Sequence, residues 1–600
     1  MTHPIPARLA ALREQMRAHG VAAVLVPTAD PHSSEYLPDH WRGRAWLSGF
    51  TGSAGTLLVG RDFAGLWTDS RYFSQAEQEL AGSGVALCRL RVQSNPEYLD
   101  WVRENLRAGE ALAVAGDSIT VGAQRQIERV LAERGATLRQ DLDLVAAIWA
   151  DRPALPTAPI VEHAIAYACV SRREKLDRVR EAMRGLGATH HLISSLDDVA
   201  WLLNLRGADV ECNPVFLAHL LVEREGRTTL FVDAAKLAGA PGAGLAADGV
   251  ALADYGSITG ALGALGPQAA LLYDPARTAS AVARAIPDAV RRIEAANPTT
   301  AFKAVKTAAE IERIRETMRV DGAALARAFH RLERALADGR PTTELTVDAL
   351  LREERSRQPG WVGESFATIA GYEANGALPH YRATPESHRV LRAEGLLLVD
   401  SGGQYLGGTT DVTRVLALGA ISPEQRRDST LVLKGMIALS RARFPKGASG
   451  PQLDALARAP LWAEGLDYGH GTGHGVGYFL NVHEGPHGIR PPTPGGALVA
   501  LEPGMISSIE PGLYRPGRHG IRHENLVVVV DGGHGEFGDF LRFEALTRCP
   551  FDRRTFDPDA LDPAERDWLD RYHETVRREV GPLLDGADRE WLERHCAPLR

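Results

Sequence analysis

Two aspartates stand at the ends of apolar runs in LLLVDSGGQYLGGTTDVTRVLAL, residues 396–418. Asp400 ends one predicted strand and Asp411 opens the next, and the glycine-rich turn between them would bring the two carboxylates close together. Burying a carboxylate is unfavourable unless it is paired or binds a cation, and two like charges at short range repel. A metal ion would relieve both penalties. For this pair alone, aspartates that cap a turn are the more common explanation.

Two glutamates occupy similar positions further along the chain. Glu510 ends the apolar stretch in MISSIEPGLY, and Glu524 directly precedes LVVVV. Such apolar runs would not interrupt a solvated charged face. Ion pairs within the fold are the alternative explanation, but Arg414 and Arg522 are the only cations close to this set of acids. Four carboxylates at strand ends therefore favour a metal site.

Histidines are concentrated in HGTGHGVGYFLNVHEGPH, residues 470–487. A helical zinc motif is excluded because no glutamate follows His470, and each of the glycines would destabilise a helix by about 1 kcal/mol. A phosphate loop is excluded because neither GxGxxG nor GK[ST] occurs. The segment predicts extended or looped backbone whose glycines make room for substrate backbone. One histidine could bind metal and others could face substrate; for each, a buried structural histidine is the alternative.

The ligand types restrict the metal. A set of carboxylates with one or two imidazoles suits manganese, iron(II), cobalt or zinc better than calcium. Four carboxylates are more than a single catalytic zinc normally uses. The set therefore predicts two ions, about 3.5–4 Å apart and bridged by carboxylates.

The elements that position these residues follow a repeat in the first half of the chain. Met16 stands four residues before Gly20, and Met183 stands four residues before Gly187; each pair is followed by an apolar strand and a hairpin pattern. Helix, glycine stop, buried strand and hairpin form one α/β unit that is used twice. Chance similarity between two α/β segments is the alternative.

Linker and capping signals divide the chain. Prolines in DRPALPTAP form a linker, and Thr307 with Glu310 forms a capping box that opens a long amphipathic helix. A further helix follows PTTEL, and mixed-charge helix occupies the chain from about 555. We expect an α/β (α+β) protein of four segments: related α/β domains at 1–155 and 160–300, a catalytic domain at 305–545 and a helical extension at 546–600.

Composition restricts the class of protein. The net charge of −8 over 600 residues argues against nucleic acid or an anionic membrane as partner. No apolar run reaches the roughly 18–20 residues of a membrane helix, and the N-terminus lacks a signal peptide pattern. The five cysteines are scattered without a CxxC pair. These features predict a cytoplasmic protein without a disulfide framework.

Together the motifs resemble the metallopeptidase family with the pita-bread fold, which includes methionine aminopeptidase, prolidase and aminopeptidase P. HGTGHGVG, FLNVHEGP, GTTDVTR and GIRHEN are similar to the long, three-domain, cytosolic aminopeptidase P group. The resemblance continues through SEYLPDHWRGRAWLSGFTGSAGT and WLLNLRGADVECNPVF into the first half. It implies a C-terminal pita-bread catalytic domain preceded by two related α/β domains.

The resemblance implies a ligand set in the family's order: Asp400, Asp411, His474, Glu510 and Glu524. Asp411 and Glu524 would bridge two divalent ions, His474 and Glu510 would complete one, and Asp400 the other. Manganese is the expected metal, with zinc or cobalt as alternatives. A water or hydroxide between the ions would attack the scissile carbonyl.

The same resemblance assigns other active-site roles. Glu510 would accept and pass on the proton. His380 and His483 would donate to the substrate carbonyl or tetrahedral oxygen, and His470 would help to form the pocket for a proline ring. Arg522 would orient a ligand carboxylate. His487 receives no role.

Two positions depart from the family pattern. Ile509 precedes the first glutamate, where a polar residue is usual, and His523 precedes the second, where an apolar residue is usual. Neither change removes a ligand. We expect His523 to influence the surroundings of the metal.

The implied reaction is removal of the N-terminal residue from peptides with proline in second place. Such a bond is a tertiary amide without an N–H, which general aminopeptidases handle poorly. The resemblance also implies a homodimer. A prolidase-like dipeptidase would share every ligand, whereas an inactive peptide-binding module would lose ligands that this chain retains.

Overall fold

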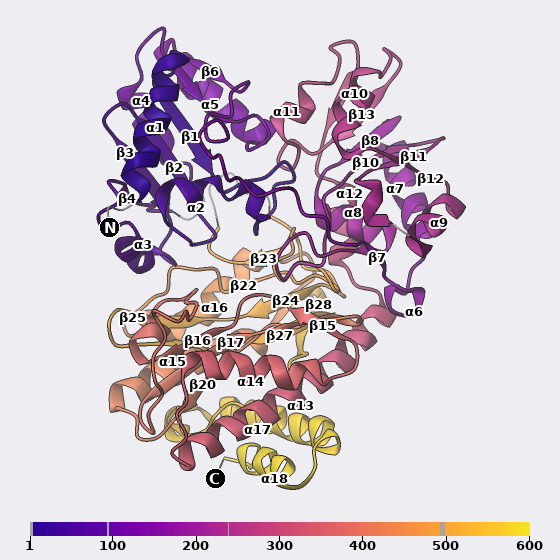
Figure 1. The fold of residues 1–600 in the computed structure, drawn as a ribbon. Coiled ribbons are helices and arrows are strands. Elements are labelled where there is room, and N and C mark those ends of the chain that lie inside the picture. The colour runs from indigo at the N-terminus through magenta and orange to yellow at the C-terminus, as the bar shows by residue number, and fades with distance from the viewer. Residues whose placement is uncertain (1–3, 93–94, 238, 493–497, 600) are drawn as a thin grey trace. The chain divides into compact units, whose positions relative to one another are not determined.

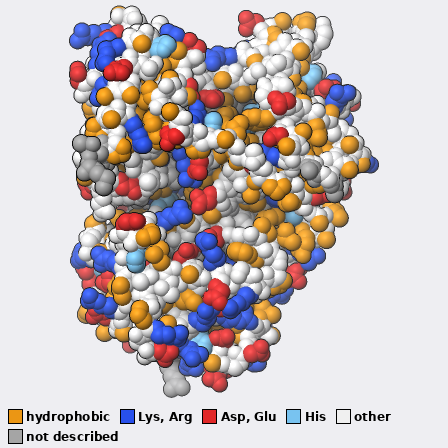
Figure 2. Space-filling view, viewed as in Figure 1, with side chains coloured by type: hydrophobic (Ala, Val, Ile, Leu, Met, Phe, Trp, Pro, Cys, Tyr) orange, Lys and Arg blue, Asp and Glu red, His pale blue; other side chains and the backbone are white. Residues whose placement is uncertain are grey.

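A computed structural model describes residues 4–92, 95–237, 239–492 and 498–599 (Figure 1). The chain forms two compact units, one of residues 1–165 with 170–300 and one of residues 166–169 with 301–600. In the face drawn in Figure 2, acidic and basic side chains are interspersed with apolar ones. Within the described ranges, no helix has the length and apolar character needed to span a bilayer.

The first unit contains two six-stranded sheets with the same topology. Their strand orders are β4-β3-β2-β1-β5-β6 and β12-β11-β10-β8-β13-β14. In each sheet the first strand pairs antiparallel with the second and parallel with the fifth. The shared order confirms the predicted repeat of one α/β unit. The strands are β1 (Ala23–Pro27), β2 (Thr56–Gly60), β3 (Ala64–Thr68), β4 (Ala86–Arg89), β5 (Ala111–Ala113), β6 (Thr137–Arg139), β8 (His190–Ile193), β10 (His219–Glu223), β11 (Thr228–Phe231), β12 (Val250–Ala253), β13 (Ala270–Tyr273) and β14 (Arg291–Glu294).

The helices that lead into the two sheets end as predicted. Helix α1 (Pro4–Ala18) is followed by Gly20, and α7 (Arg172–Leu186) by Gly187. Both glycines have positive φ, 65° and 68°, a conformation that lets the helix stop without a Cβ clash. In each copy of the repeat, the backbone then turns directly into an inner strand of the sheet, β1 in the first and β8 in the second. The predicted domain boundaries at 155–160, 300–305 and 545 stay predictions.

The second unit contains the predicted long helix, α13 (Ala308–Ala337). The Thr307 hydroxyl accepts a hydrogen bond from the Glu310 amide at 3.2 Å, and the Glu310 carboxylate accepts one from the Thr307 amide at 2.7 Å. This reciprocal pair confirms the capping box. The predicted following helix is α14 (Glu344–Ser356).

Two antiparallel sheets in this unit carry the acidic residues. In the first, β17 (Leu396–Ser401) lies between β16 (Ile369–Tyr372) and β20 (Val412–Ala417). In the second the order is β21-β28-β27-β24. Its strands are β21 (Arg443–Pro445), β24 (Ile506–Ile509), β27 (Asn525–Gly535) and β28 (Gly538–Ala545). These are the apolar runs that the sequence predicts as strands.

The connection between β17 and β20 is more than the predicted turn. It contains a second hairpin of β18 (Gly403–Tyr405) and β19 (Gly408–Thr409), which pairs with β15 (Trp361–Glu364). The Thr409 hydroxyl donates to the Gln404 side chain at 2.8 Å, so the polar groups of this buried hairpin bond to each other. The sequence pattern of small residues did not distinguish this hairpin from a loop.

Helices cover the sheets of the second unit. These are α15 (Pro423–Ser440), α16 (Gly450–Trp462), α17 (Pro563–Val580) and α18 (Gly586–His595). Helices α17 and α18 lie against α13 (Figure 1). One continuous hydrophobic core includes Ala326 of α13, Val399 of β17, Val527 of β27 and Val576 of α17. The C-terminal extension is therefore part of the core of this unit.

Glycine at the crossing of α15 and α16 provides a stability test. A Cβ at Gly435 would lie 2.2 Å from the carbonyl oxygen of Ala457, whereas one at Gly185 in α7 would meet nothing within 4 Å. We predict that Gly435→Ala lowers the free energy of unfolding by about 1–3 kcal/mol, because the two helices must separate. The matched Gly185→Ala should raise it by about 0.5–1 kcal/mol. Urea denaturation measures both; equal effects would contradict this packing.

Candidate metal centre

The sheet register brings the first two carboxylates together. Asp400 of β17 lies opposite Thr413 of β20, and Asp411 stands two residues before Thr413. Asp400 is 7% exposed and Asp411 is 4% exposed. Both side chains are therefore buried at one end of a strand pair, as the sequence predicts.

The second sheet places the two glutamates in the same way. Ile509 of β24 pairs with Asn525 of β27, so Glu510 and Glu524 extend from the same end of this pair. The Glu524 amide donates to the Thr413 carbonyl at 3.2 Å, and the Thr413 hydroxyl donates to Glu524 Oε2 at 2.7 Å. Thr413 thus joins the two sheets at the point where their acids meet.

His474 faces these carboxylates with one ring nitrogen. Its Nδ1 lies 2.9 Å from the Gly475 carbonyl, which can only accept, so Nδ1 carries the proton in the neutral ring. Its Nε2 lies 3.4 Å from Asp411 Oδ2 and 3.4 Å from Glu510 Oε1. A lone pair on Nε2 would face two acceptors, so this nitrogen requires a proton or a metal ion.

The donor set fits a divalent cation. Donor atoms of Asp411, His474 and Glu524 all lie within 4.8 Å of one another. Asp400 Oδ1 and Glu524 Oε1 are buried without a hydrogen-bond partner among the described residues. Unpartnered carboxylate oxygens in a buried acidic cluster are expected where a metal binds. Oxygen and imidazole donors match the metals predicted from the sequence.

The electrostatics of the cluster support the same conclusion. Burial raises the pKa of Asp400 to about 7, although Arg522 opposes this shift. Burial and the Asp411 charge raise the pKa of Glu524 well above its usual range. For His474, burial lowers the pKa, but the hydrogen bond with Asp411 and the Glu510 charge outweigh it and raise the pKa to about 9. A bound cation would stabilise the ionised acids and the neutral imidazole together.

Arg522 joins this cluster to a tyrosine that the sequence analysis missed. Its Nη2 donates to Asp400 Oδ2 at 2.5 Å, and its Nη1 donates to the Tyr514 hydroxyl at 2.6 Å. The same hydroxyl lies 2.9 Å from His470 Nε2. Because His470 Nδ1 faces the Gly471 carbonyl at 2.7 Å, Nε2 accepts from Tyr514. Tyr514 stands four residues after Glu510, in EPGLY. Its position in the alternating side-chain pattern of β25 (Gly512–Arg515) was the only feature of the sequence that could have indicated a side chain facing the site.

The other predicted histidines have different environments. The half-buried ring of His483 packs edge-on against that of His474, with centroids 4.3 Å apart. His380 is half-buried next to Pro379, whose carbonyl accepts from Arg522 at 3.3 Å. His487 is buried, and its Nε2 donates to the Ile506 carbonyl at 2.9 Å. That bond accounts for His487 as a structural residue.

The glycines of the histidine segment differ from expectation. A Cβ at Gly473 would lie 1.9 Å from the Ser508 carbonyl oxygen, and one at Gly475 would lie 2.0 Å from that of Glu484. These glycines make room for the protein's own backbone, so their assignment to substrate backbone was wrong. Their close packing fixes the short strand β22 (Gly473–His474) beside β24, which places His474.

The two departures from the family pattern are buried. Ile509 is 0% exposed and belongs to the hydrophobic core. His523 Nε2 hydrogen-bonds to the Ser429 hydroxyl at 2.9 Å, and its ring lies edge-on to Phe551. These contacts of His523 are with α15 and the C-terminal extension, and its expected influence on the surroundings of a metal stays a prediction.

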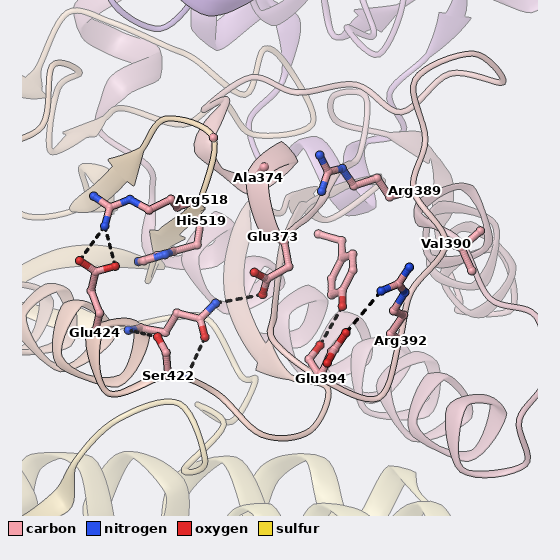
Figure 3. Close-up of a pocket in the computed structure, with 13 residues that line it drawn as sticks. Glu373, Ala374, Arg389, Val390, Arg392, Glu394, Ser422, Glu424, Arg518 and His519 are labelled. Atoms are coloured by element: carbon pink, nitrogen blue, oxygen red, sulfur yellow. Dashed lines mark hydrogen bonds and ion pairs between the residues drawn. The ribbon is translucent and has the colours of Figure 1, made fainter.

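A separate open cavity of about 700 Å³ contains none of the predicted site residues (Figure 3). Two ion pairs lie in its lining, Arg518 with Glu424 and Arg392 with Glu394, and the Gln425 amide donates to Glu373. The cavity is therefore lined by a mixed-charge surface, and the acidic cluster remains the candidate site.

Comparisons with known proteins identify the family of the chain. Residues 312–531 match metallopeptidase family M24, and residues 539–599 match the C-terminal region of peptidase M24. Residues 8–145 and 151–310 match creatinase/prolidase N-terminal domains. A probable Xaa-Pro aminopeptidase P from Laccaria bicolor is 39% identical, covering 96% of this chain and 90% of its own. Aminopeptidase P2 from Arabidopsis thaliana is 38% identical, covering 94% and 84%.

A solved structure has the same architecture. X-prolyl aminopeptidase from Caenorhabditis elegans, described as a cytosolic enzyme with a di-nuclear active site, superposes with a TM-score of 0.94 at 32% identity. The match covers 99% of this chain and 100% of that one. The chain belongs to metallopeptidase family M24, and within it to the Xaa-Pro aminopeptidase P group. The predicted three-domain pita-bread fold is confirmed.

The revised role of the glycines generates a paired test. Gly475→Ala should displace His474, because the new Cβ would overlap the Glu484 carbonyl. Gly471→Ala should be tolerated, because its nearest neighbour would lie 3.4 Å away. We predict that Gly475→Ala weakens Mn²⁺ binding by about tenfold or more, while Gly471→Ala keeps the wild-type affinity. Titration calorimetry decides, and unchanged binding by Gly475→Ala would contradict the placement.

Proposed function

We propose that the protein is a metal-dependent aminopeptidase that hydrolyses the N-terminal Xaa-Pro bond of peptides. The observation that carries the proposal is the convergence of Asp411, His474 and Glu524 donor atoms within 4.8 Å, in a chain similar throughout its length to Xaa-Pro aminopeptidases. Glu510 touches this cluster through His474, and Asp400 lies on the adjoining strand. All five predicted ligands are thus available at one end of two sheets.

We assign the ligands as the family resemblance implies. Asp411 and Glu524 would each contact two divalent ions, His474 and Glu510 would complete one site, and Asp400 the other. The description of the C. elegans enzyme as di-nuclear supports two ions, and the carboxylate-rich donor set supports manganese. Two such ions supply Lewis acidity, which lowers the pKa of water and stabilises negative charge on a carbonyl oxygen.

The chain's own groups perform the proton transfers in this proposal. Glu510 accepts a proton from the attacking water and passes it to the leaving nitrogen. Burial raises the pKa of Glu510 and the Asp411 charge adds to the shift, whereas His474 and Arg522 oppose it. His483, packed on His474, and His380, beside the Arg522 contact, donate to the substrate carbonyl oxygen.

Recognition of proline is assigned to the side of the site formed by His470. The Tyr514 hydroxyl links His470 to Arg522, which in turn holds Asp400. A proline ring that packs against His470 would therefore contact a side chain that is connected, through Tyr514 and Arg522, to the proposed ligand Asp400. This arrangement couples the position of the proline ring to the reacting centre through ordered hydrogen bonds.

We also propose a cytoplasmic location and a homodimeric state. The cytosolic description of the C. elegans enzyme supports the location. The dimer rests on the resemblance to long aminopeptidases P. The partners would be short peptides with proline in second place, with no role for nucleic acid or membrane.

A single digest tests the activity. After chelation and reloading with Mn²⁺, the enzyme should release arginine from Arg-Pro-Pro, as followed by mass spectrometry. The chelated enzyme should leave the peptide intact. Asp411→Asn should reduce kcat/KM by about 10²-fold or more, because a group that holds the charge-stabilising ions is altered. Asp288→Asn, at a fully exposed residue of the first unit, is the matched control.

Three results would contradict the proposal. Cleavage of Arg-Pro with no cleavage of Arg-Pro-Pro would identify a dipeptidase instead. An intact Arg-Pro-Pro peptide after manganese loading, together with no bound ion, would favour a peptide-binding module. Full activity of Asp411→Asn would exclude the bridged two-ion assignment.

A further inference from the structure

Arg414 is a fully buried cation directly behind the candidate metal centre. It lies on β20, three residues after Asp411, and is among the largest completely buried side chains of the described structure. Its Nη1 donates to the carbonyl of Thr413 at 2.8 Å and to that of Glu524 at 2.5 Å. One guanidinium nitrogen therefore holds the backbone beside both proposed bridging ligands.

The remaining contacts of Arg414 come largely from the C-terminal extension. Its Nε donates to the Pro550 carbonyl at 3.1 Å, and its Nη2 donates to the Cys549 carbonyl at 2.6 Å. Nη2 also contacts the Tyr572 hydroxyl at 2.9 Å, and the guanidinium carbon lies 3.9 Å from the centre of the Phe551 ring. The extension thus encloses the outward side of this cation.

The acceptors around Arg414 are neutral. They are backbone carbonyls, the Asn525 amide oxygen and a phenol, and no carboxylate of the described residues lies within ion-pair distance. A buried arginine normally pairs with an acid, because desolvating its charge is unfavourable. The carbonyl dipoles hold the charge in place without neutralising it.

Tyr572 connects the helix of the extension to the same strands. It lies on α17, and its hydroxyl contacts Arg414 Nη2 at 2.9 Å and Asn525 Oδ1 at 3.2 Å. Asn525 immediately follows Glu524. The phenol oxygen accepts from Arg414, and its single proton can be donated to the Cys549 carbonyl at 2.9 Å, the Thr547 carbonyl at 3.0 Å or Asn525 Oδ1. The hydroxyl thus connects Arg414 to the backbone of residues 547–549.

We propose that the C-terminal extension helps to build the metal centre: Tyr572 and Arg414 are positioning residues that fix the strand ends carrying Asp411 and Glu524. The inference rests on the ligand assignment of the proposed function. A chain lacking these contacts would keep its five ligands but hold the bridging pair less rigidly. Partners behind metal ligands typically contribute about 10–100-fold to metal affinity.

Removal of a single oxygen atom tests the proposal. Tyr572→Phe in the full-length protein deletes the hydroxyl and retains the packed ring. The matched control is Trp591→Phe, at a residue of the same extension. This substitution removes the hydrogen bond that the indole N–H donates to Glu333 at 2.7 Å, away from Arg414. Mn²⁺ binding is measured from the free-ion EPR signal, and thermal unfolding of the apo proteins gives the stability loss of each variant.

We expect Tyr572→Phe to raise the Mn²⁺ dissociation constant by about tenfold, while Trp591→Phe stays within twofold of wild type. Equal weakening by both variants would mean that the extension acts through general stability, and would overturn the proposal. Wild-type affinity in Tyr572→Phe would overturn it as well. Arg414→Lys keeps the charge but loses the forked contacts; it provides the same comparison if Tyr572→Phe does not fold.

Asp411→Asn separates this inference from the function on which it rests. If Asp411→Asn binds two ions like wild type, the ligand assignment fails, and the positioning proposal fails with it. If Asp411→Asn loses an ion while Tyr572→Phe and Arg414→Lys bind normally, only the positioning proposal fails.

Discussion

Mutual repulsion among buried carboxylates is the constraint on which this structure depends. Four acids end or begin apolar strands of two sheets, and burial raises the pKa of Asp400, Glu510 and Glu524. Without a cation, such a cluster opposes folding, because each ionised group has lost water and gained like-charged neighbours. The contacts of Arg522 with Asp400 and of Thr413 with Glu524 offset only part of this penalty. Ion binding and the stability of this region are consequently linked.

The surrounding fold holds the acids in place against this repulsion. Paired strands fix the acids at a common edge, and Thr413 bonds across the two sheets. Gly473 and Gly475 allow the histidine segment to pack on the backbone, which aims His474 at the cluster. Helices and the C-terminal extension then bury the outer side of these strands. The catalytic unit therefore uses core packing to place polar groups that would not assemble unaided.

The sequence predicted the parts of this arrangement that follow local rules. Apolar runs located the strands, the Thr307–Glu310 pair located α13, and acids at strand ends located the carboxylates of the proposed ligand set. Other features depend on residues distant in the chain. Tyr514 became a site residue only through contacts with His470 and Arg522, and the Arg414 network joins residues more than a hundred positions apart. The glycines were misassigned because the sequence showed that a close neighbour was needed, but not that the neighbour was Ser508 or Glu484.

The proposed function depends on Asp411 and Glu524 bridging two ions. Anomalous X-ray diffraction from manganese-loaded crystals tests it most directly, because the ions are located independently of activity. If both carboxylates bridge, we expect two anomalous peaks per chain, about 3.5–4 Å apart, each within coordination distance of Asp411 and Glu524. A single peak, or two peaks that do not share Asp411 and Glu524, would contradict it.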